Sequence, residues 1–72
     1  ATLQPPADTT DVVTVIKGVI EAEEAAISQY EKIIRLCDGF DFVTQDMCIT
    51  LLADEQQHRR VFIGFLKEYE KA

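Results

Sequence analysis

Apolar residues recur at helical spacing between about residues 11 and 37, three or four positions apart, with charged residues between them. The positions are Val12, Val13, Ile16, Val19, Ile20, Ala26, Ile27, Tyr30, Ile33, Ile34 and Cys37. Many of these side chains are β-branched, so packing must hold this helix more than intrinsic propensity does. The pattern therefore predicts one long amphipathic helix that needs a neighbour.

A turn and a second helix follow. Asp38-Gly39 ends the first pattern, and Gly39 suits the left-handed position after a helix. Asp41 can cap a second helix from about residue 42 to 70. Its stripe consists of Val43, Met47, Cys48, Leu51, Leu52, then Glu55 and His58, then Phe62, Phe65, Leu66 and Tyr69. The chain is thus predicted to be all-α, an antiparallel helical hairpin.

The first ten residues differ from the rest, because they contain two prolines and polar cap formers. We expect a crossover loop or linker over residues 1–10, with residues 11–72 forming the hairpin. Two helices alone bury a poor core, and chains of this size usually need a staple, a metal or oligomerisation. We therefore expect no folded monomer, because a second helix pair must cover the stripes, including Ile27, Leu51, Phe62 and Phe65.

Charge and cysteine content exclude several classes of function. The net charge is −6 without a basic patch, which argues against nucleic-acid binding. No apolar stretch is long enough to span a bilayer, so we expect no membrane partner and a cytoplasmic location. Cys37 and Cys48 fit a reducing compartment, and their offset of roughly 10 Å along the hairpin predicts that they stay unbridged. The charges near the C-terminus are interpreted as a solvated face: Arg59, Arg60, Lys67, Glu68, Glu70 and Lys71.

Three polar residues interrupt the apolar stripes. Glu55 and His58 are three positions apart and share one helix face. Glu23 has apolar or aromatic neighbours three, four and seven positions away, whereas Glu24 belongs to the solvated side. Glu23 lies sixteen residues before Gly39 and Glu55 sixteen after it, so the two should face each other at one height. A buried carboxylate is costly unless it is paired or binds a metal.

This set has the composition of half a di-metal site. Carboxylate-bridged bundles take one Glu from each of two helices and a Glu-x-x-His from each of the other two. Carboxylate with imidazole suits iron, manganese or zinc better than magnesium or calcium. Asp54 is a candidate for orienting an imidazole from another helix. Tyr30 should lie beside the site, as core packing or in a supporting role. A metal-free hairpin, with Glu23 and Glu55 paired to basic residues of a partner, is the alternative from a different class.

The chain resembles the ferritin-like superfamily, and more narrowly the C-terminal half of bacterioferritin and Dps-like ferritins. Residues 21–30, Glu-Ala-Glu-Glu-Ala-Ala-Ile-Ser-Gln-Tyr, look like the third bundle helix of that family, with its ligand Glu at Glu23. Residues 42–47 and 51–58 look like the fourth, where Asp-Glu-x-x-His carries a bridging Glu and a terminal His. Residues 5–12 are similar to the end of the crossover before the third helix in Dps-like members.

The resemblance implies a ferroxidase centre that oxidises Fe(II) with oxygen or peroxide and feeds iron storage in a hollow shell of many copies. Glu23 and His58 would be terminal ligands of one iron, and Glu55 would bridge to the second. The first two bundle helices and the Met that binds haem in bacterioferritins have no counterpart here, so the resemblance gives no prediction on haem. The thiol that flanks the site in some Dps-like members would fall near Ala25 and is not matched.

Several related functions stay open at this point. A two-helix encapsulated ferritin would use symmetric copies, each giving a Glu and a Glu-x-x-His. The Pro-Pro segment and the start at Ala1 without an initiator Met favour half of a single-chain bundle instead. Peroxide reduction of the rubrerythrin or manganese catalase kind is a further alternative. The missing partner is accordingly expected to be an N-terminal helix pair or a second copy.

Overall fold

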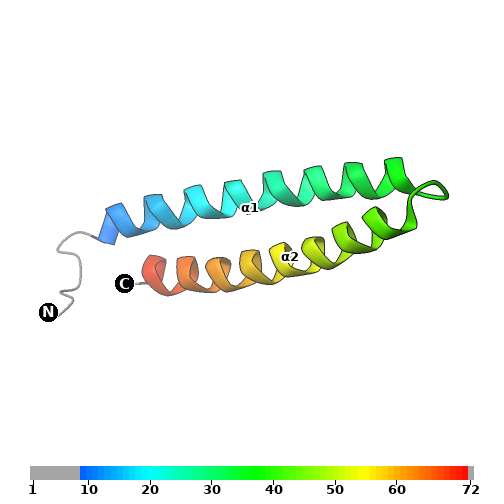
Figure 1. Cartoon of the computed structure of the whole chain (residues 1–72). Coiled ribbons are helices and arrows are strands. Elements are labelled where there is room, and N and C mark those ends of the chain that lie inside the picture. The colour runs from blue at the N-terminus through cyan, green and yellow to red at the C-terminus, as the bar shows by residue number, and fades with distance from the viewer. Residues whose placement is uncertain (1–8, 72) are drawn as a thin grey trace, which may run out of the picture.

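Two long helices joined by a short turn make up the fold (Figure 1). The computed structural model describes residues 9–71, with α1 at Thr9–Cys37 and α2 at Phe42–Lys71. The helices run antiparallel side by side, with the start of α1 and the end of α2 opposite the turn. The predicted all-α hairpin is confirmed. Helix α1 begins two residues before the predicted start, and the rest of the predicted crossover loop lies outside the described residues.

The turn is closed by its own backbone and by Asp41. Gly39 has φ 69, in the left-handed region, and the N–H groups of Phe40 and Asp41 each donate to Cys37 O at 2.9 Å. Asp41 Oδ1 accepts from the backbone N–H of Thr44 at 3.0 Å, and Thr44 Oγ1 donates to Asp41 Oδ2 at 2.6 Å. The predicted roles of Gly39 and Asp41 are both confirmed.

Gln45 ties the two helices together just beyond the turn. Its Nε2 donates to the carbonyl oxygen of Ile34 at 3.0 Å and to Asp38 Oδ1 at 3.1 Å. One amide thereby satisfies a carbonyl near the end of α1, where helical partners run out. The turn and these two hydrogen bonds of Gln45 fix the register of α2 against α1.

The core is the seam between the helices, and it is thin. Ile16, Ile27 and Cys48 are the buried apolar residues of the described chain. The expectation that Ile27 awaits a second helix pair is wrong, because α2 already covers it and leaves it 7% exposed. Cys37 and Cys48 are both free thiols. Burial, followed by the charges of Asp41 and Cys48, raises the pKa of the Cys37 thiol.

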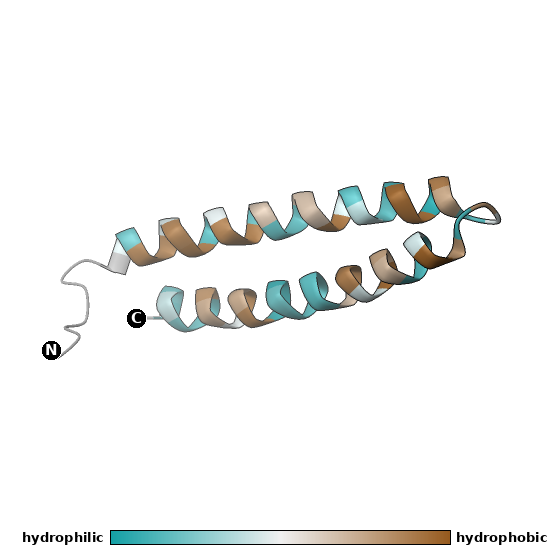
Figure 2. Cartoon of the chain, in the orientation of Figure 1, coloured by the Kyte–Doolittle hydropathy of each residue, from teal (hydrophilic) through white to brown (hydrophobic). Residues whose placement is uncertain are grey.

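One apolar line along α2 is left uncovered. We call it the open stripe, and its members are Val43, Met47, Leu51, Val61, Phe65 and Tyr69. They are spaced for a single helix face, with Asp54 and His58 at the two remaining positions of the line. Figure 2 shows that the hydrophilic residues of α2 gather in the middle of the helix. Neither described helix is long and apolar enough to cross a membrane.

Candidate metal centre

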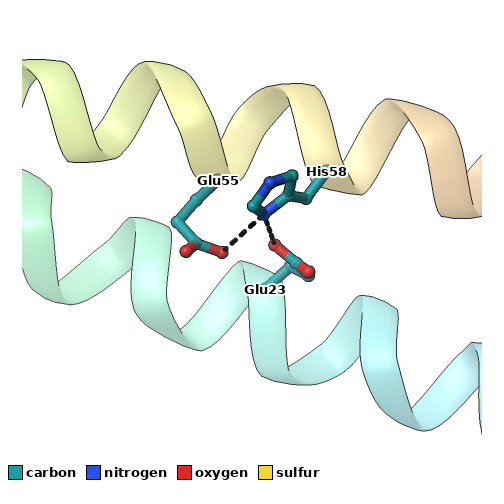
Figure 3. Close-up of side chains that lie close together, drawn as sticks. All are labelled: Glu23, Glu55 and His58. Carbon is teal, nitrogen blue, oxygen red and sulfur yellow. Dashed lines mark ion pairs between the residues drawn. The ribbon is translucent and has the colours of Figure 1, made fainter.

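Three side chains converge at the middle of the hairpin. Glu23 points from α1 toward α2, while Glu55 and His58 come from successive turns of α2 (Figure 3). His58 Nδ1 lies 3.7 Å from Glu23 Oε2 and 3.9 Å from Glu55 Oε2. One ligand atom from each residue lies within 4.8 Å of the other two. The equal spacing of the two glutamates from Gly39 thus brings them together across the seam.

The exposure of the three side chains increases with distance from the seam between the helices. The side chain of Glu23 is 11% exposed, that of Glu55 25% and that of His58 58%. Glu24, the next residue, is exposed, so the helix phase separates the two neighbouring carboxylates as the sequence predicts. The cluster therefore opens on the side of His58, which is the side of the open stripe.

The two carboxyl groups perturb each other. Glu55, as a hydrogen-bond partner of protonated Glu23, raises the pKa of Glu23, and burial and repulsion by the Glu55 charge raise it further. His58 acts in the opposite direction and lowers the pKa of Glu23. With both carboxyls ionised, Glu23 Oε2 is a buried oxygen without a hydrogen-bond donor. An unsatisfied buried carboxylate oxygen is costly, and a cation would satisfy it.

The donor chemistry fits a divalent transition metal. Two carboxylates and a neutral imidazole are ligands that iron, manganese and zinc accept. Glu23, Glu55 and His58 are the one group of three such residues found within residues 9–71. No pocket is found among residues 9–71, so the three candidate ligands lie on an open face of the hairpin. Three ligands from two helices leave part of a coordination sphere to be supplied from outside the hairpin.

The two residues predicted to support the site stand apart from it. Asp54 is exposed, and Tyr30 is partly buried in the seam. No hydrogen bond or ion pair among residues 9–71 joins either of them to the three candidate ligands. Their supporting roles stay predictions that depend on a further helix.

Arg59 departs from its predicted place. The sequence pattern predicts it on the solvated face, but it is partly buried, and its buried Nε has no hydrogen-bond partner in the described hairpin. The signal was available, because Arg59 follows Glu55 by four residues and so shares its helix face. Arg60 is exposed as expected, and its Nη2 donates to Gln57 Oε1 at 2.9 Å.

Comparison with known proteins identifies a family that agrees with the composition of the site. No curated protein and no solved structure matches the chain significantly. The family model described as the ferritin-like domain matches residues 1–72, the whole of the sequence. With two packed helices and a central cluster of two glutamates and a histidine, the chain belongs to the ferritin-like domain family.

Proposed function

We propose that this protein binds iron and takes part in the oxidation of Fe(II) at a carboxylate-bridged di-iron centre, of which one chain supplies half. The observation that carries the proposal is the convergence of Glu23, Glu55 and His58, with a buried carboxylate oxygen left unsatisfied between them. Membership of the ferritin-like domain family supports an iron-related function. Manganese and zinc suit the same ligands and are the competing metals.

Each ligand has a proposed role. Glu23 and His58 would hold one iron as terminal ligands, and Glu55 would be shared with a second iron. Glu55 suits the bridging role because its carboxylate lies between the two helices and is only partly exposed. Bound iron supplies the electrons that reduce oxygen or peroxide, and the ferric product is stored. A bacterioferritin-like or Dps-like shell is the finer form of this proposal.

The orientation of His58 determines which of its ring nitrogens would carry a proton in the proposed site. His58 Nδ1 faces both carboxylates, so as a ligand it must be unprotonated there, with the proton on Nε2. Nε2–H then needs an acceptor, and Asp54 of another helix pair is the proposed one. A metal that binds the Glu23 carboxylate competes with a proton for it, and the raised pKa of Glu23 makes this competition stronger than at a free Glu.

The test is an anaerobic Fe(II) titration of the assembled protein, followed by addition of oxygen and optical detection of Fe(III). Glu23→Ala should weaken Fe(II) binding and slow oxidation, because it removes a ligand from the seam. Glu24→Ala is the matched control, since it removes an exposed neighbouring carboxylate. Equal losses in the two variants would show that charge alone, and not coordination, holds the iron.

A metal-free interaction hairpin is the second candidate. It is favoured by the 58% exposure of His58 and by the open stripe around it. Metal analysis of the purified protein, and of protein incubated with Fe(II), Mn(II) and Zn(II), separates the two. Absence of stoichiometric metal under all four conditions would leave only the interaction role.

A further inference from the structure

We propose that the guanidinium of Arg59 is the counter-ion of Glu23 and Glu55 while no metal is bound, and that it competes with a metal for these two carboxylates. Arg59 is then a residue that sets the affinity of the site without being one of its ligands. The competition rests on the proposed function, whereas the ion pair in the metal-free chain is independent of any metal.

Arg59 differs in its burial from the other basic residues of the described chain. The remaining Lys and Arg residues within residues 9–71 are exposed, whereas Arg59 is partly buried. The Nε atom of Arg59 is buried without a hydrogen-bond partner, and the guanidinium forms no ion pair with any residue of the same range. A charged group withdrawn from water without a partner is costly. The position of Arg59 therefore predicts an anionic partner.

The other unsatisfied side chain of the hairpin is complementary to Arg59. Glu23 Oε2 and Arg59 Nε are the two buried side-chain atoms that have no hydrogen-bond partner in the described chain. One is a carboxylate oxygen that accepts and the other a guanidinium nitrogen that donates, so contact between the two side chains would satisfy both groups at once. The planar fork of the guanidinium has enough N–H donors to bind Glu23 and Glu55 together.

The register of the hairpin places Arg59 one helical turn from both carboxylates. Arg59 follows Glu55 by four residues, a spacing at which Cβ atoms are about 5–6 Å apart, and an acidic residue before a basic one is the favoured order. Arg59 lies twenty residues after Gly39 and Val19 twenty before it, so Arg59 is level with Val19, one turn of α1 from Glu23. The other residues three or four positions from Arg59 and from Val19 carry no negative charge: Val15, Ile16, Ala22, Gln56, Phe62 and Ile63.

The guanidinium and a divalent cation exclude each other at these carboxylates. Both are positively charged, so they repel each other at short range, and carboxylates that bind a metal have little charge left to stabilise a partly buried guanidinium. While Arg59 is paired, only the molecules in which it has moved away can bind metal, and the apparent affinity is reduced by that fraction. Arg59 thus stabilises the empty site and weakens metal binding.

Isothermal titration of the assembled protein with Zn(II) tests the competition. Arg59→Met keeps the unbranched stem and removes the charge, so the affinity for Zn(II) should rise by about fivefold or more, the lower end of the usual coupling between two binding events. Arg59→Lys keeps the charge and should restore the affinity of the parent. Arg60→Met is the matched control, because it removes the same charge from the neighbouring exposed residue. A fall in affinity in Arg59→Met, as a purely structural role would give, would overturn the competition, and so would an equal rise in Arg60→Met.

Thermal unfolding of the metal-free protein tests the ion pair itself. Arg59→Met should lower the melting temperature of the parent by several degrees. The same change should have little effect in a chain that also carries Glu23→Gln and Glu55→Gln, because no negative charge then remains to be paired. Equal losses in the two backgrounds would show that Arg59 only packs and would refute the ion pair.

The two experiments separate this inference from the proposed function. A parent that binds neither Zn(II) nor Fe(II) would refute the proposed function and the competition with it, while the unfolding comparison would still decide the ion pair. A parent that binds metal, with no gain of affinity in Arg59→Met, would refute the competition and leave the proposed function standing.

Discussion

The turn and the middle of the hairpin differ in whether their polar groups have hydrogen-bond partners. At the turn, Asp41, Thr44 and Gln45 satisfy one another and the backbone within a few residues. At the middle, Glu23, Glu55 and His58 approach one another, yet Glu23 Oε2 has no donor. The pKa shifts have opposite signs as well, since the pKa of Asp41 is lowered and that of Glu23 is raised.

The two pKa shifts show which region supplies the partners that an ionised carboxylate needs. Hydrogen bonds to the ionised form lower a carboxyl pKa, as the hydroxyl and backbone N–H of Thr44 do for Asp41. A second carboxyl group and burial act against ionisation, as they do for Glu23. The turn satisfies its own polar groups, whereas the middle leaves a buried carboxylate oxygen without a donor, and the proposed function places a cation there.

The largest effect expected at the middle is from Glu55→Ala. Loss of groups that merely support metal ligands costs about 10–100-fold in affinity, so loss of a bridging ligand should cost more than about 100-fold. His58→Ala should cost less, because His58 is the most exposed ligand and serves one metal. Isothermal titration with Zn(II) or anaerobic Fe(II) measures both.

The control for this comparison is Glu31→Ala, which removes a partly buried carboxylate away from the cluster. Its metal affinity should stay within a factor of a few of the parent chain. Unchanged affinity in Glu55→Ala would exclude the di-metal centre.

The folding stability of the metal-free protein should depend on pH through the ionisation of Glu23. A raised carboxyl pKa means that the folded state holds the proton more tightly than the unfolded chain. This contribution to stability is fully present below the ordinary pKa of 4.5 and is lost as pH rises through the raised value. Metal must displace the same proton, so affinity should rise over the same window.

Thermal unfolding of the parent chain and of Glu23→Gln, followed across this window without metal, measures the effect. The melting temperature of the parent should fall relative to that of the variant as pH rises. Parallel curves would mean that Glu23 titrates like a free carboxyl group.

A change at the turn should affect stability and leave metal binding alone. Gly39→Ala places a side chain at φ 69, where nothing lies within 4 Å to obstruct it, so the cost is backbone strain alone. That strain is about 1 kcal/mol. Guanidinium unfolding of the assembled protein should show this loss, while Zn(II) affinity stays unchanged. A fall in affinity would mean that the turn controls the register at the ligands.

The smallest effect is expected from Asp41→Ala, which removes the cap of α2. Because hydrogen bonds from Thr44 lower its pKa, Asp41 stabilises the fold above pH 3.8, and the contribution is lost as pH falls through the lowered value. The melting temperatures of parent and variant should therefore differ at neutral pH and converge in acid. A constant difference across pH would assign the effect to packing and not to charge.

The sequence predicts the hairpin and the convergence at its middle for identifiable reasons. Gly39 marks the turn, helical spacing sets the faces, and equal distances from Gly39 set the height of Glu23 against Glu55. Spacing does not reveal which side of a wide stripe meets α1. The pattern therefore predicts a second helix pair over Ile27 and a solvated Arg59, whereas Ile27 and the Nε of Arg59 are buried within the hairpin itself. The remaining ligands of the proposed site would come from other helices, and spacing within the hairpin carries no information about them.

The central position of Glu23 in α1 also bears on how long the proposed site would retain an ion. Helices open most readily from their ends, and such fraying rarely reaches beyond the first turns. Glu23 lies about 21 Å from either end of α1, so local opening at the termini leaves its backbone in place. Amide hydrogen exchange at Glu23 should accordingly follow opening of the whole hairpin rather than fraying of its ends. Under the proposed function, release of a bound ion would then require more than fraying of the helix ends.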